Sequence, residues 1–392
     1  MTDGSATVLP VPLLRPGERR ISLIAILASA FASTVTFAMS TPLLSMRLEA
    51  QGVSGSIIGL NTAVEAAAIL FFTLATPTLA RRLGAANALY LGVAIMTAAI
   101  ALLPVWNSIE GWFVLRFVMG AGIAIHWVIG EVWLNTVADD STRGRVVGLY
   151  VTTMSAAYCL GFPVLMITGT EGYLPFYLIT GTVAASALPL IFARRLIPSL
   201  PSEAAAHYAT LLRRQPTLMA AAVLNGVLIN SVLAFFPIFS DRMGVGERAG
   251  FGMLFAVALG NVLLQLPIGM MADRHDGRDG RKLLIFLAIT SAVGFLLLPL
   301  VLDSLAAWPL LTIWGGSFGG LYTVGLAMVG RRFGPGDLAA ANALFAFTYE
   351  TGTLVGPVFV GTSLDLWNPY GFLAAGGGAC LLFLLIALTR RV

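Results

Sequence analysis

Long apolar runs separated by short polar segments dominate the chain. An α-helix needs about 20 mostly apolar residues to cross about 30 Å of hydrocarbon, and twelve runs reach that length. The predicted spans are 21–46, 56–80, 86–104, 111–138, 145–169, 173–197, 217–240, 250–272, 282–303, 305–331, 338–364 and 369–389. The pattern therefore predicts an all-α integral membrane protein with twelve transmembrane helices.

The composition agrees with a membrane protein. Of 392 residues, 58% are hydrophobic and 11% are charged, whereas a soluble domain carries about 25% charged residues. The spans leave hardly any residues for a soluble domain. We divide the chain into an N-terminal tail (1–20), a six-helix bundle (21–197), a connector (198–216) and a second six-helix bundle (217–392). Residues 202–214 of the connector are readable as a helix at the membrane surface.

Arginine and lysine fall mainly on one side of the predicted membrane. The chain ends and the loops between spans fall alternately on the two sides of the membrane. Nineteen of the 23 Lys and Arg residues lie on the side that holds both termini, whereas Arg47, Arg242 and Arg248 lie on the other side. By the positive-inside rule, both termini are cytoplasmic. The expected location is the inner membrane of a bacterial cell. The same bias explains the basic composition, so no nucleic-acid partner is expected.

The two halves of the chain resemble each other. Arg81 and Asp273 follow the second and eighth spans, 192 residues apart, and Pro163 and Pro357 occupy the fifth and eleventh spans, 194 residues apart. Glycines recur in the fourth span and in the tenth, where the string GGSFGG stands. A nearly constant offset is typical of a duplicated six-helix unit.

Several short motifs accompany this duplication, and together they resemble the major facilitator superfamily over nearly the whole chain. They are the Asp-Arg loop with Gly269, Asp273, Arg274, Gly280, Arg281 and Lys282, the fourth-span pattern Arg116, Gly120 and Gly122, the antiporter-like glycines with Pro357 (Gly352, Gly356 and Gly361), and the string E-x-W-L-N from Glu131 to Asn135, which resembles one bacterial subgroup. The resemblance implies two pseudo-symmetric bundles that rock around a substrate site near the midplane. It also implies a monomer in contact with membrane lipid.

Five ionisable residues lie within predicted spans: Glu65, Arg116, His126, Glu131 and Glu350. A charge at the centre of a span costs about 2.5–3.5 kcal/mol even on the most lenient scale, so these residues must face water, pair or be neutral. We interpret Glu65, Glu350 and His126 as proton-coupling residues because they lie near mid-depth. The alternatives are a helix–helix hydrogen bond by a protonated acid for the glutamates, and a neutral packed imidazole for His126.

Polar and aromatic side chains at the same depth are candidates for a cavity wall. Ser29, Ser33, Thr36 and Ser40 share one helical face, which suits close packing as well as solvent lining. Trp314, Phe318 and Tyr322 also share a face and favour core packing. The predicted substrate-binding residues are Arg116, His126, Trp127, Asn225, Asn230, Asn261, Gln265, Tyr322 and Tyr349.

The gates are predicted on the cytoplasmic side. The resemblance implies that Asp273 and Arg274 latch that side in the outward-facing state. In the first-half copy Arg81 replaces the expected aspartate, so Arg81 or Arg82 must meet another acid: Glu131, Asp139 or Asp140. Five helical residues turn the chain by about 500°, so His126 and Glu131 point about 140° apart. We therefore expect His126 in the cavity and Glu131 at the gate.

The function predicted from these features is secondary active transport of a small organic solute, by proton-coupled efflux (antiport). The acids at mid-depth favour a cationic or neutral polar solute, although Arg116 could hold an acidic group. The alternatives are proton-coupled uptake, a lipid-like substrate, or a non-transporting sensor or assembly factor. No phosphate-binding loop or catalytic motif is present, and the methionines and two cysteines form no metal-ligand pattern. We therefore expect no enzyme activity, cofactor or metal.

Overall fold

The structure is a computed structural model that describes residues 15–137, 143–198, 208–274 and 280–389. Within these ranges, twelve helices are long and apolar enough to cross a membrane. They are α1 (Pro16–Ala50), α2 (Gly55–Leu83), α3 (Ala85–Leu102), α4 (Ile109–Val137), α5 (Arg143–Thr168), α6 (Leu174–Ala193), α8 (Pro216–Arg242), α9 (Glu247–Arg274), α10 (Gly280–Val301), α11 (Ala307–Arg332), α12 (Pro335–Leu366) and α13 (Gly371–Thr389). The prediction of an all-α, twelve-helix membrane protein is confirmed.

The helix ends differ from the predicted spans by a few residues. For example, α1 begins at Pro16 and ends at Ala50, and α12 begins at Pro335. Proline suits the first turn of a helix, where its missing N–H would have no partner. In α1 the Glu18 carboxylate accepts a hydrogen bond from the Arg15 backbone N–H at 2.9 Å. Polar ends therefore extend these helices beyond the apolar segments by which the spans were recognised.

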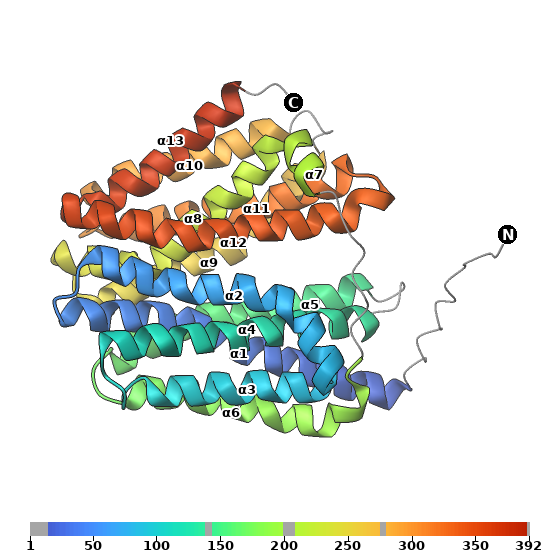
Figure 1. Cartoon of the computed structure of the whole chain (residues 1–392). Helices are drawn as coiled ribbons and strands as arrows, with labels where there is room; N and C mark the ends of the chain where they lie inside the picture. The colour runs from blue at the N-terminus through green and yellow to red at the C-terminus, as the bar shows by residue number, and fades with distance from the viewer. Residues whose placement is uncertain (1–14, 138–142, 199–207, 275–279, 390–392) are drawn as a thin grey trace.

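The helices pack mainly within two sequence halves, with α1 to α6 along one side of the molecule and most of the later helices along the other (Figure 1). In the first half α4 packs against α1, α2 and α3, and in the second half α11 packs against α8, α9 and α10. The two halves meet mainly where α2 lies against α12 and α5 lies against α9. Under the observed duplication these two contacts are equivalent, which gives the fold its pseudo-symmetry.

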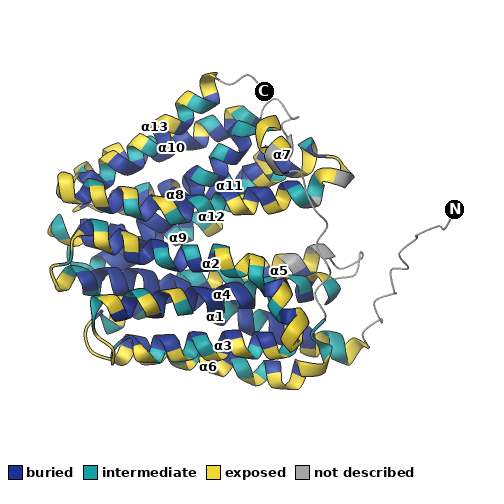
Figure 2. Cartoon of the chain, in the orientation of Figure 1, coloured by how far each residue is buried: buried dark blue, intermediate teal, exposed yellow. Residues whose placement is uncertain are grey.

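Buried residues concentrate where the helices meet (Figure 2). Many large apolar side chains are exposed on the helices. Phe192, Leu300 and Leu266 are 79%, 76% and 71% exposed. A soluble protein rarely presents apolar surface of this extent to water, whereas lipid makes it favourable. The outer surface therefore matches the membrane assignment.

Glycines allow several of the helix contacts. A methyl group at Gly226 of α8 would overlap the Tyr349 carbonyl oxygen of α12, and one at Gly352 would overlap the Val223 carbonyl oxygen. A methyl group at Gly120 of α4 would lie 2.5 Å from the Glu65 carbonyl oxygen of α2. These positions bring backbones together, as small residues do at membrane helix interfaces.

The connector forms a shorter helix within the described residues than its sequence predicts. The helix α7 spans Tyr208–Arg214, and the preceding part of the expected surface helix, with His207, lies outside the described residues. Arg214 Nη1 lies 3.1 Å from Asp337 Oδ2 at the start of α12. This exposed pair joins the connector to the second half.

Candidate functional site

A cavity of about 320 Å³ lies between the two halves, close to the middle of the helices. Its volume falls in the range of small-molecule binding pockets. Side chains from α1, α2, α4 and α5 form one wall, and side chains from α8, α9, α11 and α12 form the other. Because both halves contribute, a molecule in this cavity contacts residues that move relative to each other whenever the halves move.

Glu350 projects from the second half into the cavity. Its Oε2 accepts a hydrogen bond of 2.9 Å from Thr353 Oγ1, one turn later on α12. The neighbouring Tyr349 and Tyr322 also line the cavity, with ring centroids 5.3 Å apart in an edge-to-face arrangement. Among the described residues that line the cavity there is no Lys, Arg or His, so Glu350 has no cationic partner there.

Two asparagines of α8 hold the same wall together. Asn225 Nδ2 donates to the Phe318 carbonyl oxygen of α11 at 2.6 Å, and Asn230 Nδ2 donates to the Thr353 carbonyl oxygen of α12 at 2.8 Å. Both side chains are 2% exposed and line the cavity. These two hydrogen bonds join α8 to α11 and α12 at the depth of Glu350. The Asn230 Oδ1 atom has no hydrogen-bond partner among the described residues.

Asn261 and Gln265 line the cavity from α9, as predicted from their helical spacing. Gln265 Nε2 lies 3.4 Å from Asn261 Oδ1, at the long end of hydrogen-bond geometry. The predicted residues Trp127, Tyr322 and Tyr349 line the cavity as well. Seven of the nine predicted substrate-binding residues are thus brought together at one place, since Arg116 and His126 do not line it.

Arg116 is bound to Glu65 inside the first half. Arg116 Nη1 lies 2.6 Å from Glu65 Oε2, and the two side chains are 0% and 2% exposed. Gly120, one turn after Arg116, is the point of close approach between α4 and α2 that lets the guanidinium reach the carboxylate. This pairing was not predicted, because counting along the helices puts the two residues at different depths. The pair neutralises both charges, so Arg116 is not presented to an acidic ligand in the cavity.

Three polar atoms of this pair have no hydrogen-bond partner among the described residues: Glu65 Oε1, Arg116 Nε and Arg116 Nη2. Glu65 contributes to the cavity wall, whereas Arg116 lies behind it. The pair is therefore a neutral unit at the edge of the cavity, with its carboxylate on the cavity side.

His126 lies away from the cavity lining. Its Nε2 is 2.6 Å from Ser29 Oγ of α1, and the residue is 2% exposed. The next residue, Trp127, lines the cavity and donates from Nε1 to Ser33 Oγ at 3.3 Å. Ser29 and Ser33 of the predicted stripe therefore join α1 to α4. None of its four members (Ser29, Ser33, Thr36 and Ser40) lines the cavity, which agrees with the packing alternative.

Glu131 lines the cavity, although it was expected at a gate apart from it. It is exposed in the open cavity, and it forms no hydrogen bond or ion pair with a described residue. Of the two residues, Glu131 and not His126 lines the cavity. The helical angle between them is as predicted, but the direction of the cavity around α4 was not known from the sequence.

One face of α5 that lines the cavity is not among the predicted site residues. Tyr150, Met154 and Tyr158 line the cavity at intervals of four residues, the spacing of one helix face. Phe37 of α1 adds a ring between Trp127 and Tyr158, with centroid distances of 6.2 Å to each. The spacing was visible in the sequence, but without an ionisable residue in the set it was not singled out.

The aromatic series of α11 divides between core and cavity. Trp314 and Phe318 are buried, with ring centroids 5.3 Å apart, and Trp314 Nε1 donates to the Ser291 carbonyl oxygen of α10 at 3.0 Å. Tyr322 alone of the three reaches the cavity. Core packing, the favoured alternative for this series, applies to the first two members.

Of the predicted gate residues, Arg81 and Arg82 belong to the last turn of α2, at the end of the molecule where α1 begins (Figure 1). Arg81 and Arg82 are exposed at the end of α2, and Arg81 Nη2 donates to Thr78 Oγ1 at 2.9 Å. Asp273 and Arg274 belong to the last turn of α9, and their side chains are outside the described part of the structure, as are Asp139 and Asp140. The gate assignment stays a prediction.

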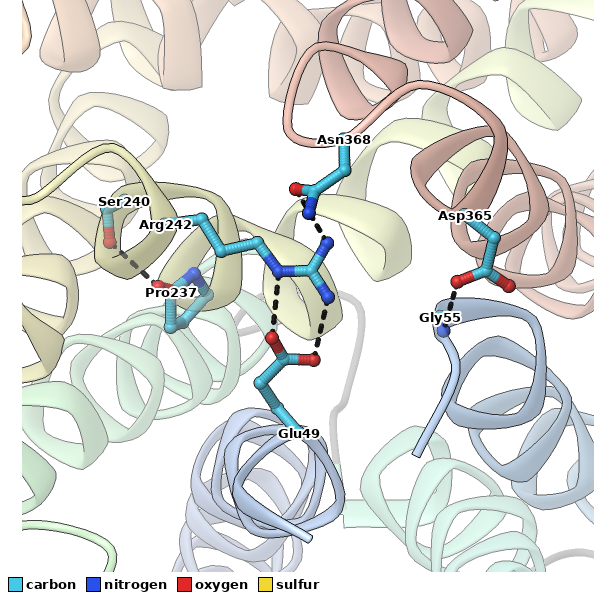
Figure 3. Close-up of polar contacts among 7 residues, drawn as sticks. All are labelled: Glu49, Gly55, Pro237, Ser240, Arg242, Asp365 and Asn368. Carbon is cyan, nitrogen blue, oxygen red and sulfur yellow. Dashed lines mark hydrogen bonds and ion pairs between the residues drawn. The ribbon is translucent and has the colours of Figure 1, made fainter. Parts of the chain in front are cut away.

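A polar cluster that was not predicted joins the halves at the opposite end (Figure 3). The Arg242 guanidinium of α8 makes two hydrogen bonds to the Glu49 carboxylate of α1, at 2.8 and 3.0 Å, and a third to Asn368 Oδ1 at 2.9 Å. Nearby, the Asp365 carboxylate of α12 accepts hydrogen bonds from the backbone N–H groups of Gly55 and Ser56, at 2.6 and 2.8 Å. We call Glu49, Arg242, Asn368 and Asp365 the outer cluster.

Close backbone packing accompanies the outer cluster. A methyl group at Gly55 would lie 2.6 Å from the Gly361 carbonyl oxygen, and one at Gly59 would overlap the Pro357 carbonyl oxygen. The start of α2 is therefore pressed against the last turns of α12. The end of the molecule away from the termini is closed, and the cavity lies beyond this closure.

The shared cavity, the closed end and the duplicated helix pattern all fit a carrier, and sequence comparison decides the family. A sequence model of the Major Facilitator Superfamily matches residues 26–321 and 249–392. The chain belongs to the Major Facilitator Superfamily. Membership makes it a multi-pass membrane transporter and not an enzyme. The narrower subgroup expected from the E-x-W-L-N string stays a prediction.

Known proteins similar to this member of the superfamily cover most of its length. The uncharacterized MFS-type transporter YcaD of Escherichia coli K12 is 27% identical over 339 residues, which are 85% of this chain and 86% of that protein. The crystal structure of the nucleoside transporter NupG has a TM-score of 0.74 at 15% identity and covers 94% of this chain and 100% of its own. A bacterial homolog of the lysosomal transporter Spinster, in an inward-facing and unoccupied conformation, has a TM-score of 0.75 at 15% identity, with coverage of 95% and 96%. These structures share the fold.

Proposed function

We propose that this member of the superfamily is a proton-coupled secondary transporter that expels a small organic cation in exchange for protons. The observation that carries the proposal is Glu350, a carboxyl group in the cavity shared by both halves whose hydrogen-bond partner is a threonine hydroxyl. An intramembrane acid without a cationic partner is a functional group by default. It can hold either a proton or a cation, and exchange of one for the other is antiport.

The geometry narrows the set of predicted proton-coupling residues. Glu65 is neutralised by Arg116, and His126 is bonded to Ser29 outside the cavity lining. We therefore assign the proton to Glu350 and give Glu65 and His126 supporting roles in the first half. Glu131 is a second acid of the same cavity. With Glu65 neutralised, two acids and no base remain in the described cavity lining, which favours a cation over an anion by simple Coulomb attraction.

Alternating access follows from the position of the outer cluster. We propose that the bundles 21–197 and 217–392 move as units, and that the present conformation is closed at the outer cluster. Release of the solute on that side then requires the Glu49–Arg242 and Asp365–α2 contacts to break. The predicted gates at the other end, Asp273 and Arg274 with Arg81 and Arg82, would close in the same movement. The positive-inside bias supports an orientation in which the outer cluster faces the outside of the cell.

The test is a flux measurement with purified protein in proteoliposomes that contain a pH-sensitive dye. An imposed pH gradient should drive movement of an organic cation and an opposite movement of protons in the wild type. Glu350→Gln should abolish both, whereas Glu171→Gln, a matched change in an exposed loop, should leave both unchanged. Absence of solute and proton movement in the wild type, over a panel of cations, neutral polar solutes and carboxylates, would contradict the proposal and favour the sensor or assembly role.

Uptake by symport is the alternative within transport. It predicts that proton and solute move in the same direction across the proteoliposome membrane. The direction of the dye signal relative to the solute gradient separates the two in the same experiment. The shared use of one carboxyl group by proton and cation favours antiport, since both cannot occupy it together.

A further inference from the structure

A second pocket, of about 230 Å³, lies beside the central cavity between α5 and the second-half helices α8, α9 and α11. Its wall is almost entirely apolar and includes Val151, Phe162, Leu233, Val257, Ala258 and Val262. Ser155 and Asn261 are its polar residues. We call it the side pocket. Its lining suits a hydrocarbon group and offers no charged partner.

The side pocket and the central cavity share part of their walls. Met154 and Tyr158 of α5, with Ile229 of α8 and Asn261 of α9, line both. Tyr158 and Asn261 face the polar residues of the central cavity on one side and the apolar lining on the other. The two spaces are thus adjacent compartments of one site, with polarity that changes from one to the next.

The side pocket reaches the outer surface of the helix bundle. Two of its lining residues on opposite sides, Val151 of α5 and Val262 of α9, are 43% and 37% exposed. Both are apolar and lie within transmembrane helices, so this exposed rim of the side pocket suits contact with the hydrocarbon of the membrane. A molecule that partitions into lipid therefore has a direct lateral approach to the site.

The central cavity, next to the side pocket, is lined by groups that attract a cation. Besides Glu350 and Glu131, it is lined by the rings of Trp127, Tyr158, Tyr322 and Tyr349. Aromatic faces attract cations, more strongly where water is excluded. An ammonium group with attached carbons is matched by this combination of carboxylate and rings better than a strongly hydrated metal ion.

We infer that the substrate is an amphipathic organic cation, with its charged nitrogen among Glu350 and the aromatic rings and its apolar part in the side pocket between α5 and α9. This inference rests on the proposed function and names its substrate class. A small polar cation would leave the side pocket unused, and a neutral hydrocarbon would leave two acids in the cavity unpaired. The two compartments together select a molecule that has both parts.

The inference is tested by equilibrium binding of an alkyltrimethylammonium series to the full-length protein in zwitterionic lipid nanodiscs. Titration calorimetry against protein-free nanodiscs removes the contribution of partition into lipid. Affinity should rise about fourfold for each added methylene, the ratio that corresponds to about 0.8 kcal/mol per buried CH₂, until the side pocket is full. Glu350→Gln should lower the affinity for every member, tetramethylammonium included.

Filling the side pocket separates the two compartments. Ala258→Phe should abolish the dependence on chain length and leave tetramethylammonium affinity within about twofold of wild type, a difference below about 0.5 kcal/mol. Leu263→Phe, on the same helix and 56% exposed, lies outside both pockets and should change neither. Retention of the tetramethylammonium affinity shows that Ala258→Phe is folded.

Three results would overturn the inference. The first is equal affinity for an alkyl sulfate of the same length, which would indicate a general lipid site. The second is a chain-length dependence that Ala258→Phe leaves intact, and the third is unchanged binding in Glu350→Gln. Failure of the proposed function is separable. Binding of alkylammonium ions as expected, without gradient-driven flux, would contradict proton coupling and support the inferred binding site. Gradient-driven flux of another solute, without binding of any alkylammonium, would support proton coupling and contradict the inferred substrate class.

Discussion

Arg116 of α4 and Glu65 of α2 form an ion pair of 2.6 Å between side chains that are 0% and 2% exposed. Burial of two charges costs desolvation free energy, and this cost is offset by the attraction between the two partners. Loss of one partner therefore leaves an uncompensated buried charge. The pair is thus a structural bond between the two helices and a neutral border for the cavity.

Substitution of one partner should therefore destabilise the protein strongly. Arg116→Met is expected to lower the free energy of unfolding by about 3–5 kcal/mol, because Glu65 is left buried without a cation. The measurement is thermal unfolding in detergent followed by a thiol-reactive dye, since Cys380 is buried and Cys159 half-buried in the folded protein.

The matched control is the double variant Arg116→Met with Glu65→Leu. Replacement of both charges by apolar groups is often neutral or stabilising, so the double variant should recover most of the loss. If the double variant were as unstable as the single one, the pair would matter through side-chain shape and not through charge.

Glu350 should make cation binding depend on pH. The carboxylate binds the cation and the protonated acid does not, so affinity should fall as the pH falls, by up to tenfold per pH unit where the group titrates. The other groups that face it are the hydroxyls of Thr353, Tyr349, Tyr322 and Tyr158 and the acid Glu131. In Glu350→Gln the residual affinity should vary little with pH, and any variation left should disappear on further replacement of Glu131.

Counterflow, the exchange of solute across the membrane without a pH gradient, should separate the role of Glu350 in proton coupling from its role in solute binding. Coupling free energies between two ligands are about 1–3 kcal/mol, or about 5- to 150-fold. Glu350→Asp should retain pH-dependent counterflow, whereas Glu350→Gln should lose the effect of pH on counterflow. An unaltered pH profile in Glu350→Gln would move the proton site to another residue.

The outer cluster should bias the protein toward the conformation described here. Capping of the first turn of α2 by Asp365 and the half-buried Glu49–Arg242 pair are together worth about 2 kcal/mol. The double variant Glu49→Gln with Asp365→Asn should therefore shift the population toward an open outer end by about 30-fold.

Distances between spin labels at Ser54 and Thr362, in a background with both cysteines replaced by alanine, report that shift. Both positions are exposed, one before α2 and one on α12. The control is Asp303→Asn with Glu171→Gln, two exposed loop acids that take no part in the contacts described for the outer cluster. This control should leave the distance distribution unchanged. An unchanged distribution in the cluster variant would show that glycine packing alone holds this end closed.

Substitutions of Glu131 and His126 should have different effects, because Glu131 lines the cavity and His126 does not. Glu131→Gln should lower cation affinity by about two- to fivefold, as expected for one exposed charge near the ligand. His126→Ala should leave affinity nearly unchanged and lower stability by about 1 kcal/mol through loss of its hydrogen bond to Ser29. Titration calorimetry and thermal unfolding of both variants decide; a strong affinity loss in His126→Ala would place the imidazole in the site after all.

Much of the candidate site was predictable because polar residues at membrane depth are rare. Asn225, Asn230 and Glu350 stand out in apolar helices for that reason alone, and each lines the cavity. Tyr150, Met154 and Tyr158 were missed because an aromatic face is equally typical of core and of cavity. Periodicity finds a face, and only the neighbouring helices tell what that face meets.

The sequence by itself determined the twelve spans, the six-plus-six duplication and the family motifs, because hydropathy and helix length are local properties that lipid enforces one segment at a time. The tertiary structure decided which side chains meet. It paired Arg116 with Glu65, bound His126 to Ser29, turned Glu131 to the cavity and closed the outer end through Glu49, Arg242 and Asp365. The rotation of each helix about its axis and its choice of neighbours arise from packing between segments far apart in the chain, which no local pattern records.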